Sequence, residues 1–404
     1  MTPTSEQELA EAIKGATSPL HIKGGGTRPI GNPVEGDVLS TSGLSGITLY
    51  EPGALTLVAQ AGTPWAEIEA ALDAENQRLA FEPMDHRTLL GTSGEPTIGG
   101  VVAANVSGPR RISVGACRDH MLGVRFVDGQ GTITKNGGRV MKNVTGYDLV
   151  KLLTGSYGSL GVLSEVSLKV LPKPETSATL ILSGLDELQA VGAMSRALGS
   201  PYEITGAAWD QAGAVHLRLE GFEASVAYRT QQLSDLLAEF GDVQQGDDPA
   251  ATWAAIRDVV PFADKEVVVR MSIKPSDLSE LLFAARNTFV TYDGHETTFD
   301  VMADWGGGLV WFGADAAQLL DCARVLEGEP TVEAGAKVFV EFLQSYGSFD
   351  GGHATVVKGP ESLRCAVSVF QPENETVTAL SQALRKTFDP RGILNSGIMA
   401  RGAQ

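Results

Sequence analysis

Apolar and polar positions follow two different patterns along the chain, which meet near residue 175. From Val162 to Leu171 apolar and polar side chains alternate, as is typical of a β-strand, and prolines at 172 and 174 end the run. Before it, short strand-like runs such as LHIK (20–23) and DVLS (37–40) alternate with helical stretches. One of these, PWAEIEAALDAE (64–75), carries proline at the expected first helical position, where its missing N–H costs nothing. The pattern predicts an α+β domain over residues 1–175.

After residue 175 a strand-then-helix order repeats. The strand-like ATLILS (178–183) precedes the helical LDELQAVGAMSRAL (185–198), and three later pairs repeat this order as far as residue 328. Such repeats predict a ferredoxin-like α+β layer, with helices on one face of a sheet, over residues 176–384. The tail FDPRGILNSGIM (388–399) is rich in glycine, proline and asparagine, yet too apolar to remain in solvent. We expect residues 385–404 to dock on the body of the protein.

Composition narrows the function. The 404 residues carry a net charge of −18, which argues against a nucleic-acid-binding surface. Three distant cysteines, Cys117, Cys322 and Cys365, cannot supply an iron–sulfur cluster or a structural zinc site from this chain alone. Their odd number suits a reducing compartment. No secretory signal and no apolar run long enough to cross a bilayer is evident, so the sequence predicts a cytoplasmic protein.

Two glycine-rich segments are the candidate binding elements. In LHIKGGGTRP (20–29), three glycines form either a tight turn or a loop whose bare N–H groups approach a phosphate. In TIGGVVAANVSGPRR (97–111), small residues would let a flat ligand lie against the backbone, or would let a helix pack closely. Neither segment contains G-x-G-x-x-G or a Walker pattern. A nucleotide cofactor would therefore bind to a fold that is not of the Rossmann type.

These segments, with GACRDHMLGVRFVDGQG (115–131), KNVTGYDLVKLLTGSYGSLGVLSEVSLKVLP (142–172) and the tail, resemble the vanillyl-alcohol oxidase (PCMH-type) FAD-binding flavoproteins. The tail resembles the 2-hydroxy-acid members, among them the FAD-binding subunits of bacterial glycolate oxidases. The resemblance implies an α+β fold: a PCMH-type FAD-binding domain of two α/β subdomains over 1–175, a ferredoxin-like α+β cap over 176–384, and a tail, 385–404, on the FAD site.

The resemblance also implies a set of FAD contacts. The first loop would bind the pyrophosphate, with Gly25 expected at a positive φ, and the second would hold the flavin and ribityl chain. Arginines beside the loops would pair with phosphate, Gly161 and Val162 would meet the adenine, and Asn395 would return to the flavin. The implied residues are Gly24, Gly25, Gly26, Thr27, Arg28, Thr97, Ile98, Gly99, Gly100, Asn105, Ser107, Gly108, Arg110, Gly161, Val162 and Asn395. Thr27 and Arg28 stand where other members carry a tethering histidine, so FAD is expected to be non-covalent. Cys117 is expected to be a small buried residue.

The function that the resemblance implies is that of one FAD-binding subunit of a glycolate oxidase complex. A larger FAD subunit and an iron–sulfur subunit would be its partners, electrons would pass toward quinone, and membrane contact would be indirect. Related dehydrogenases carry a metal motif, H-x-G-D-G-N-x-H, where this chain has ADWGGGLVWFG (303–313), so no metal ligand or catalytic residue is assigned. Two alternatives stay open. One is a self-sufficient 2-hydroxy-acid dehydrogenase that uses Arg270 or Lys274, and the other is a non-catalytic scaffold with structural FAD.

Overall fold

The computed structural model describes residues 1–140, 146–289, 297–326, 329–349 and 351–400, in two compact units. The first unit contains Met1–Gly108, Val114–Lys173 and Glu373–Gln404, and the second contains Pro109–Ser113 and Pro174–Pro372. The first boundary lies two residues before the position expected from the sequence. The second lies at 372 rather than 384, so the helix after it belongs to the first unit.

The described part of the first unit holds one five-stranded sheet and two pairs of strands. A five-stranded antiparallel sheet has the order β3 (Ile47–Glu51), β4 (Thr56–Gln60), β8 (Val162–Lys169), β6 (Met121–Val127) and β7 (Ile133–Gly137). A parallel pair joins β1 (Leu20–Lys23) to β2 (Asp37–Ser40), and a short pair joins β5 (Gln77–Arg78) to β9 (Leu171–Pro172). The strand predicted over 162–171 is therefore present as β8 and β9. The parallel pair has its own core, in which Leu20 and Leu39 pack with Ile13, Val162 and Leu394.

Helices of the first unit are short apart from two at its ends. They are α1 (Glu6–Gly15), α2 (Trp65–Asp73), α3 (Arg87–Leu90), α4 (Ile98–Ala103), α6 (Leu149–Leu153) and α14 (Glu375–Phe388). Pro64 is the N-cap of α2 rather than its first helical residue, so the helix begins one residue later than expected. A further short helix, α5 (Arg111–Val114), lies where the chain first passes between the units.

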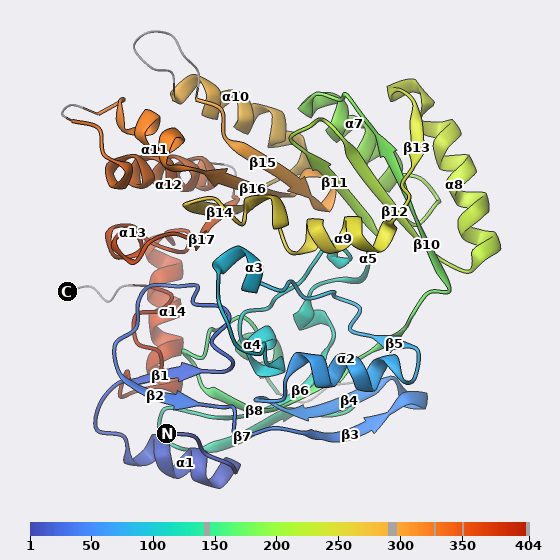
Figure 1. Ribbon diagram of the computed structural model, residues 1–404. Helices are drawn as coiled ribbons and strands as arrows, with labels where there is room; N and C mark the ends of the chain where they lie inside the picture. The colour runs from blue at the N-terminus through green and yellow to red at the C-terminus, as the bar shows by residue number, and fades with distance from the viewer. Residues whose placement is uncertain (141–145, 290–296, 327–328, 350, 401–404) are drawn as a thin grey trace. The chain divides into compact units, whose positions relative to one another are not determined.

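The second unit is one eight-stranded antiparallel sheet with helices packed on it (Figure 1). Its order is β13 (Val243–Gln245), β10 (Thr176–Leu182), β12 (Val215–Gly221), β11 (Gly206–Asp210), β15 (Asp300–Asp304), β16 (Leu309–Ala314), β14 (Val267–Ser272) and β17 (His353–Lys358). The first four and the last four strands each follow the βαββαβ order of a ferredoxin-like unit. The expected ferredoxin-like cap therefore contains that unit twice, and pairing of β11 with β15 joins the two copies.

The helices of the second unit mostly cover one face of its sheet. They are α7 (Glu187–Leu198), α8 (Glu223–Leu237), α9 (Pro249–Arg257), α10 (Leu278–Thr288), α11 (Ala316–Ala323), α12 (Val332–Phe349) and α13 (Glu361–Ala366). Alternate strand residues such as Val310 and Phe312 form one apolar core with α7, α8, α10, α11 and α12. By contrast, Trp253 of α9 contacts the opposite face, where it lies under Arg218 and donates to Thr179 Oγ1 (2.9 Å). Within the described residues, no helix is both long enough and apolar enough to span a membrane.

Candidate functional site

The glycine loop at 24–26 follows β1 and packs against the segment that leads into α4. A Cβ at Gly25 would lie 1.6 Å from the carbonyl oxygen of Glu95, and a Cβ at Gly24 would overlap Thr97 Oγ1. Gly25 therefore needs to be glycine because two backbones approach closely there, whereas at Gly24 the close neighbour is the Thr97 side chain. The expectation of a positive φ at Gly25 is wrong: the left-handed residue is Gly26, at φ +70°, with open space around it.

The second loop places the N-terminus of α4 beside the first loop. Buried Thr97 is the N-cap of α4, and its Oγ1 accepts from the N–H of Gly100 (3.3 Å). A Cβ on Gly99 would lie 2.6 Å from the carbonyl oxygen of Ala61, and Ile98 is fully buried. Gly99 thus allows close packing of α4, which was one of the two interpretations left open.

Arg28 brings a positive charge to the junction of the two loops. Its Nε lies 3.1 Å from Nδ1 of buried His86, and the same ring nitrogen lies 3.3 Å from the carbonyl oxygen of Met84. A Cβ on Gly100 would lie 3.4 Å from Arg28 Nη1, which places the guanidinium next to α4. Arg28 Nη2 is buried without a hydrogen-bond partner in the described part of the chain. Burial lowers the pKa of Arg28 to about 10, an effect that nearby Asp85 opposes.

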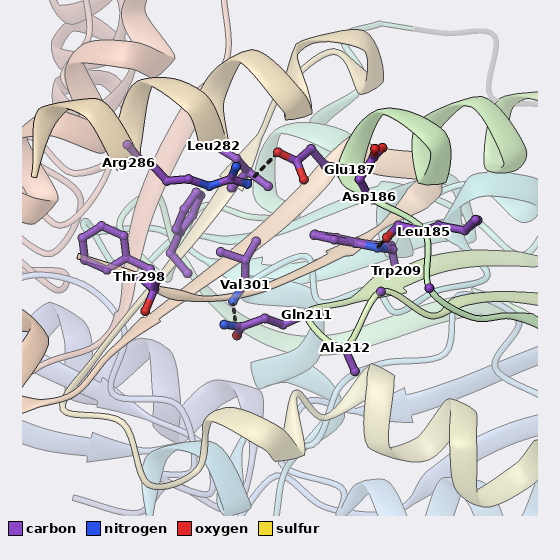
Figure 2. A pocket seen from close by; sticks show the side chains of 15 residues that line it. Leu185, Asp186, Glu187, Trp209, Gln211, Ala212, Leu282, Arg286, Thr298 and Val301 are labelled. Atoms are coloured by element: carbon purple, nitrogen blue, oxygen red, sulfur yellow. Dashed lines mark hydrogen bonds and ion pairs between the residues drawn. The ribbon is translucent and has the colours of Figure 1, made fainter. Parts of the chain in front are cut away.

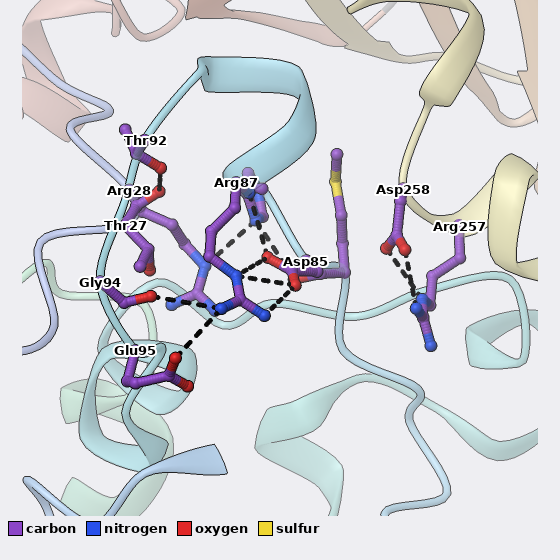
Figure 3. A network of polar contacts seen from close by, with 11 residues as sticks. Thr27, Arg28, Asp85, Arg87, Thr92, Gly94, Glu95, Arg257 and Asp258 are labelled. Atoms are coloured by element: carbon purple, nitrogen blue, oxygen red, sulfur yellow. Dashed lines mark hydrogen bonds and ion pairs between the residues drawn. The ribbon is translucent and has the colours of Figure 1, made fainter. Parts of the chain in front are cut away.

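A second arginine ties together the two segments that flank Arg28. Arg87 forms a fork with Asp85, whose Oδ2 lies 2.8 Å from Nη2, and Nη1 reaches the carbonyl of Gly94 and a carboxylate oxygen of Glu95 (Figure 3). Burial raises the pKa of Asp85, but hydrogen bonds from Arg87 outweigh it and hold the pKa below its ordinary value. Sequence analysis missed this network because its members come from unremarkable stretches. The glycine at 94 was the one visible signal.

Asn105 and Ser107 shape the second loop through their side chains. Asn105 Oδ1 accepts from the N–H of Arg118 (3.0 Å), and Ser107 Oγ accepts from the N–H of Cys117 (2.9 Å). The N–H of Gly108 donates to the carbonyl of Phe81 (2.9 Å). These bonds fold residues 105–108 back onto the unit. Contact of Asn105, Ser107 and Gly108 with a flavin stays a prediction.

Asn395 connects the C-terminal tail to the strand that precedes the glycine loop. Its Oδ1 accepts from the N–H of Ile22 (2.8 Å), and its Nδ2 donates to the carbonyl of Tyr157 (2.8 Å). One residue earlier, Leu394 forms a bridge with Leu20 of β1. The tail also reaches Asn32, whose Nδ2 donates to the carbonyl of Gly397. Asn395 therefore holds the tail against β1 through hydrogen bonds, and a direct flavin contact stays a prediction.

Three other predicted contact residues lie elsewhere. Gly161 packs against the Phe126 ring, where a Cβ would be 2.6 Å from Cδ2, and Val162 begins β8 with its side chain in the core. Arg110 differs from the other residues that were expected to contact FAD. It belongs to the second unit and forms a two-pronged ion pair with Glu220, a buried carboxylate of β12 (2.9 Å). This pairing satisfies the guanidinium, so we do not propose Arg110 as a phosphate ligand.

The residues of the first unit fit a bound dinucleotide with an anionic pyrophosphate. A bare-backbone loop, a left-handed glycine and a buried arginine nitrogen without a partner meet at one place. Together they offer N–H donors and positive charge to an anion. Cys117, by contrast, is fully buried, and burial raises the pKa of its thiol, which leaves it a core residue. Residues 142–145, at the start of the segment 142–172 quoted above, lie outside the described residues.

The stretch 303–313 comprises the end of β15, the turn at 305–308 and most of β16 in the second unit. Asp304 accepts from the N–H of Trp305 (2.7 Å), and the Arg111 guanidinium lies 4.5 Å from the centroid of the Trp305 ring. Within the described residues, no group of three or more His, Cys, Asp or Glu side chains could hold a metal ion. His295 lies outside those residues, so it is not placed.

The chain is similar to several known proteins. Residues 1–137 match the family model described as "FAD binding domain". The chain is 31% identical over 401 residues to glycolate oxidase subunit GlcE of Escherichia coli K12, covering 97% of each protein. It is 25% identical to glycolate oxidase subunit GlcD of Bacillus subtilis 168, covering 94% of this chain and 83% of the relative. A solved alkyldihydroxyacetonephosphate synthase superposes with a TM-score of 0.69 at 18% identity, covering all of this chain and 77% of the other, which shows a shared fold.

Proposed function

Because this chain belongs to the family of the FAD-binding glycolate oxidase subunits, we propose that it is one subunit of a complex that oxidises glycolate to glyoxylate. It is an FAD-dependent oxidoreductase, and FAD is its cofactor. The observation that carries the proposal is the similarity to GlcE over 97% of both chains. A relative that shared the cofactor domain alone would match a much smaller part. The proposed partners are a larger FAD-binding subunit and an iron–sulfur subunit.

In the proposed site, FAD supplies two-electron chemistry, and the protein supplies position and charge. The loop at 24–27 would direct backbone N–H groups at the pyrophosphate, and Arg28 would add the positive charge. The buried Nη2 of Arg28 supports this role. Its burial without a hydrogen-bond partner costs free energy, and a bound anionic group would offset that cost. The first turn of α4, with Thr97 to Gly100, would lie beside the flavin and ribityl chain.

We assign substrate oxidation to the partner subunit rather than to this chain. Loss of the hydroxyl proton of a 2-hydroxy acid at neutral pH needs a metal or a base in reach. The stretch 303–313 offers no histidine, and its one carboxylate, Asp304, accepts from the Trp305 backbone. Electrons would pass through the flavin and the iron–sulfur subunit toward quinone. The complex would be cytoplasmic, and any membrane contact would come through its other members.

One observation favours a second candidate, a self-sufficient dehydrogenase. Arg270 of β14 is half-buried, and its side chain makes neither a hydrogen bond nor an ion pair among the described residues. A guanidinium in that state suits the carboxylate of a small acid. Lys274, the other residue considered, lies 3.9 Å from the carboxylate of Asp277, so Arg270 is the better candidate.

An anaerobic reduction experiment separates these functions. The isolated FAD-loaded chain and the complex purified through a tag on this chain are each mixed with excess glycolate, and flavin absorbance is followed. We expect bleaching in the complex and none in the isolated chain, with or without added zinc or manganese. Rapid bleaching of the isolated chain that Arg270→Gln abolishes would instead establish the self-sufficient enzyme. Flavin that is never reduced in either sample would indicate a scaffold.

A further inference from the structure

A cavity of about 340 Å³ lies in the second unit, on the helix-covered face of the sheet. Its walls come from α7 and α10, which are equivalent helices of the two ferredoxin-like copies, and from β11, β15 and β16 below them (Figure 2). The junction of β11 with β15 forms its floor. None of the residues that the FAD proposal uses takes part, so this cavity is a separate candidate site.

The interior of the cavity is apolar and aromatic. Trp209, Phe299 and Phe312 line it together with Leu282 and Val301, and each of these side chains is buried. The Trp209 ring is held in place because its Nε1 donates to the carbonyl of Leu185 (3.4 Å). On the floor, Gln211 is fixed by the N–H of Val301, which donates to its Oε1 (3.1 Å). The cavity is therefore lined by aromatic side chains, of which Trp209 is held by a hydrogen bond.

Charged side chains stand at the mouth of the cavity. Arg286 of α10 reaches across to Glu187 of α7, with 2.6 Å between Nη2 and Oε1, and Asp186 lies beside this pair (Figure 2). The same three residues also line a second, more open hollow with Leu188, Ser279, Glu280 and Phe283. The mouth and the hollow thus carry three carboxylates against one guanidinium. Leu188 and Phe283 are both more than 60% exposed.

We propose that this cavity binds a ligand made of an aromatic ring next to a positive charge. The ring would enter among Trp209, Phe299 and Leu282, where burial of its apolar surface drives binding. The cation would stop at Asp186 and Glu187, close to the ring of Trp209, where carboxylates and an aromatic face both favour it. An anion would meet an excess of negative charge at the mouth, because Glu187 already neutralises Arg286.

Two kinds of ligand could supply an aromatic ring next to a positive charge. A free aromatic amine could supply the ring and the charge, or a polypeptide could supply an aromatic side chain flanked by lysine or arginine. In the second case the exposed Leu188 and Phe283 would contact the flanking chain. Both sources share the ring in the cavity and the cation at Asp186 and Glu187, so one set of variants tests both.

Calorimetric titration of the FAD-loaded full-length protein tests the proposal with three nearly isosteric probes. Phenethylamine carries a cation, 2-phenylethanol is neutral and phenylacetate carries an anion. We expect phenethylamine to bind at least tenfold more tightly than 2-phenylethanol, and phenylacetate no more tightly than the alcohol. An acetylated lysine–phenylalanine–lysine amide is the polypeptide arm. Tighter binding of this peptide than of phenethylamine would identify a polypeptide source, and the reverse would identify a free amine.

Two variants connect the binding to the cavity. Ala285→Leu, on the buried side of α10, fills the cavity and should abolish binding of every probe. Glu187→Gln removes a charge at the mouth and leaves Arg286 without its partner. It should weaken phenethylamine binding at least fivefold and strengthen phenylacetate binding. The matched control is Glu239→Gln, which removes a carboxylate paired with Arg196 near the other end of α7. It should leave the affinities for phenethylamine and for phenylacetate unchanged.

Several results would overturn the proposal. Preference of the wild-type protein for phenylacetate would show that Arg286 rather than the carboxylates selects the ligand. Binding of phenethylamine that Ala285→Leu leaves unchanged would place it outside the cavity, and binding that Glu187→Gln leaves unchanged would show that the cation is not held at Glu187. Absence of binding by both phenethylamine and the peptide would show that the cavity takes neither. Flavin content and the circular dichroism melting curve confirm that each variant is folded.

Discussion

Replacement of Gly25 by alanine adds one methyl group at the point where the glycine loop touches the segment before α4. The new Cβ would lie 1.6 Å from the carbonyl oxygen of Glu95, whereas real Cβ atoms keep at least 3.0 Å. The obstacle is a backbone atom, so rotation of a side chain cannot relieve it. The two loops would have to separate by well over an ångström, and they are the loops proposed to hold the pyrophosphate.

The expected loss follows from this geometry. Overpacking a tight contact costs about 1–3 kcal/mol. Relief of the overlap separates the two loops and so removes the arrangement proposed to bind FAD. If restoring that arrangement costs this energy, affinity for FAD falls roughly 5- to 150-fold, because about 1.4 kcal/mol corresponds to tenfold in a dissociation constant. Gly25 lies in the loop after β1 and outside the five-stranded sheet, so the fold should survive. The control is Gly53→Ala in the same unit, where a Cβ meets nothing within 4 Å.

The assay is titration of each deflavinated variant with FAD, followed by quenching of flavin fluorescence. Gly53→Ala should match the wild-type protein, and Gly25→Ala should require a much higher FAD concentration for half-saturation. Circular dichroism melts of the apoproteins show whether the loss is local. Equal FAD affinity for the two variants would refute the reasoning, since it would mean that the approach of Gly25 to Glu95 has no part in the cradle.

Four further outcomes are expected. Trichloroacetic acid should release all FAD into the supernatant, because the first loop carries no histidine and Cys117 is buried; flavin that stays with the pellet would contradict this. Arg28→Gln should weaken FAD binding about 10- to 100-fold, the value of a hydrogen bond to a charged group, and an unchanged titration would remove Arg28 from the site. Asn395→Ala deletes bonds to Ile22 and Tyr157 and should lower the urea midpoint of the first unit, whereas an unchanged midpoint would make this clamp dispensable. The pKa of Asp85 is lowered from its ordinary value of 3.8, so its stabilising effect is present above that pH and is lost as pH falls below it. Asp85→Asn should therefore flatten the stability profile below pH 3.8, and parallel profiles of the variant and the wild-type protein in that range would contradict the shift.

Local patterns were enough to predict most elements of the fold, but not how they assemble. The alternation from Val162 to Leu171 became β8 and β9, and the strand–helix repeats became the cap. The second ferredoxin-like copy could not be inferred, because pairing of Trp209 with Ala303 joins strands almost a hundred positions apart. Nothing in either strand alone specifies that partner. The position of α9 was missed for a similar reason, since Trp253 is fixed by Arg218 on a distant strand.

The candidate site could likewise be predicted only in part from local sequence. Glycine at 24–26 was a visible signal, but the reason for Gly25 was assigned to backbone dihedrals when it lies in contact with Glu95. His86 and Asp85 carry no motif, and their importance comes from side chains that the fold brings to them. Arg110 looked like a phosphate ligand by its neighbours in sequence, and its actual partner, Glu220, is 110 positions away.

The bond between Asn395 and Ile22 also has a consequence for biosynthesis, because it joins positions separated by 373 residues. Arg391 adds to this closure by donating to the carbonyls of Ile13 and Gly129. As a chain emerges from the ribosome, its early part folds first. Here β1 lacks its partner in the C-terminal tail until the whole second unit has been translated. We therefore expect FAD uptake to be a late event, complete only in chains that have been synthesised past residue 395. Chains that stall within the second unit would be left without a stable flavin site and so be open to proteolysis.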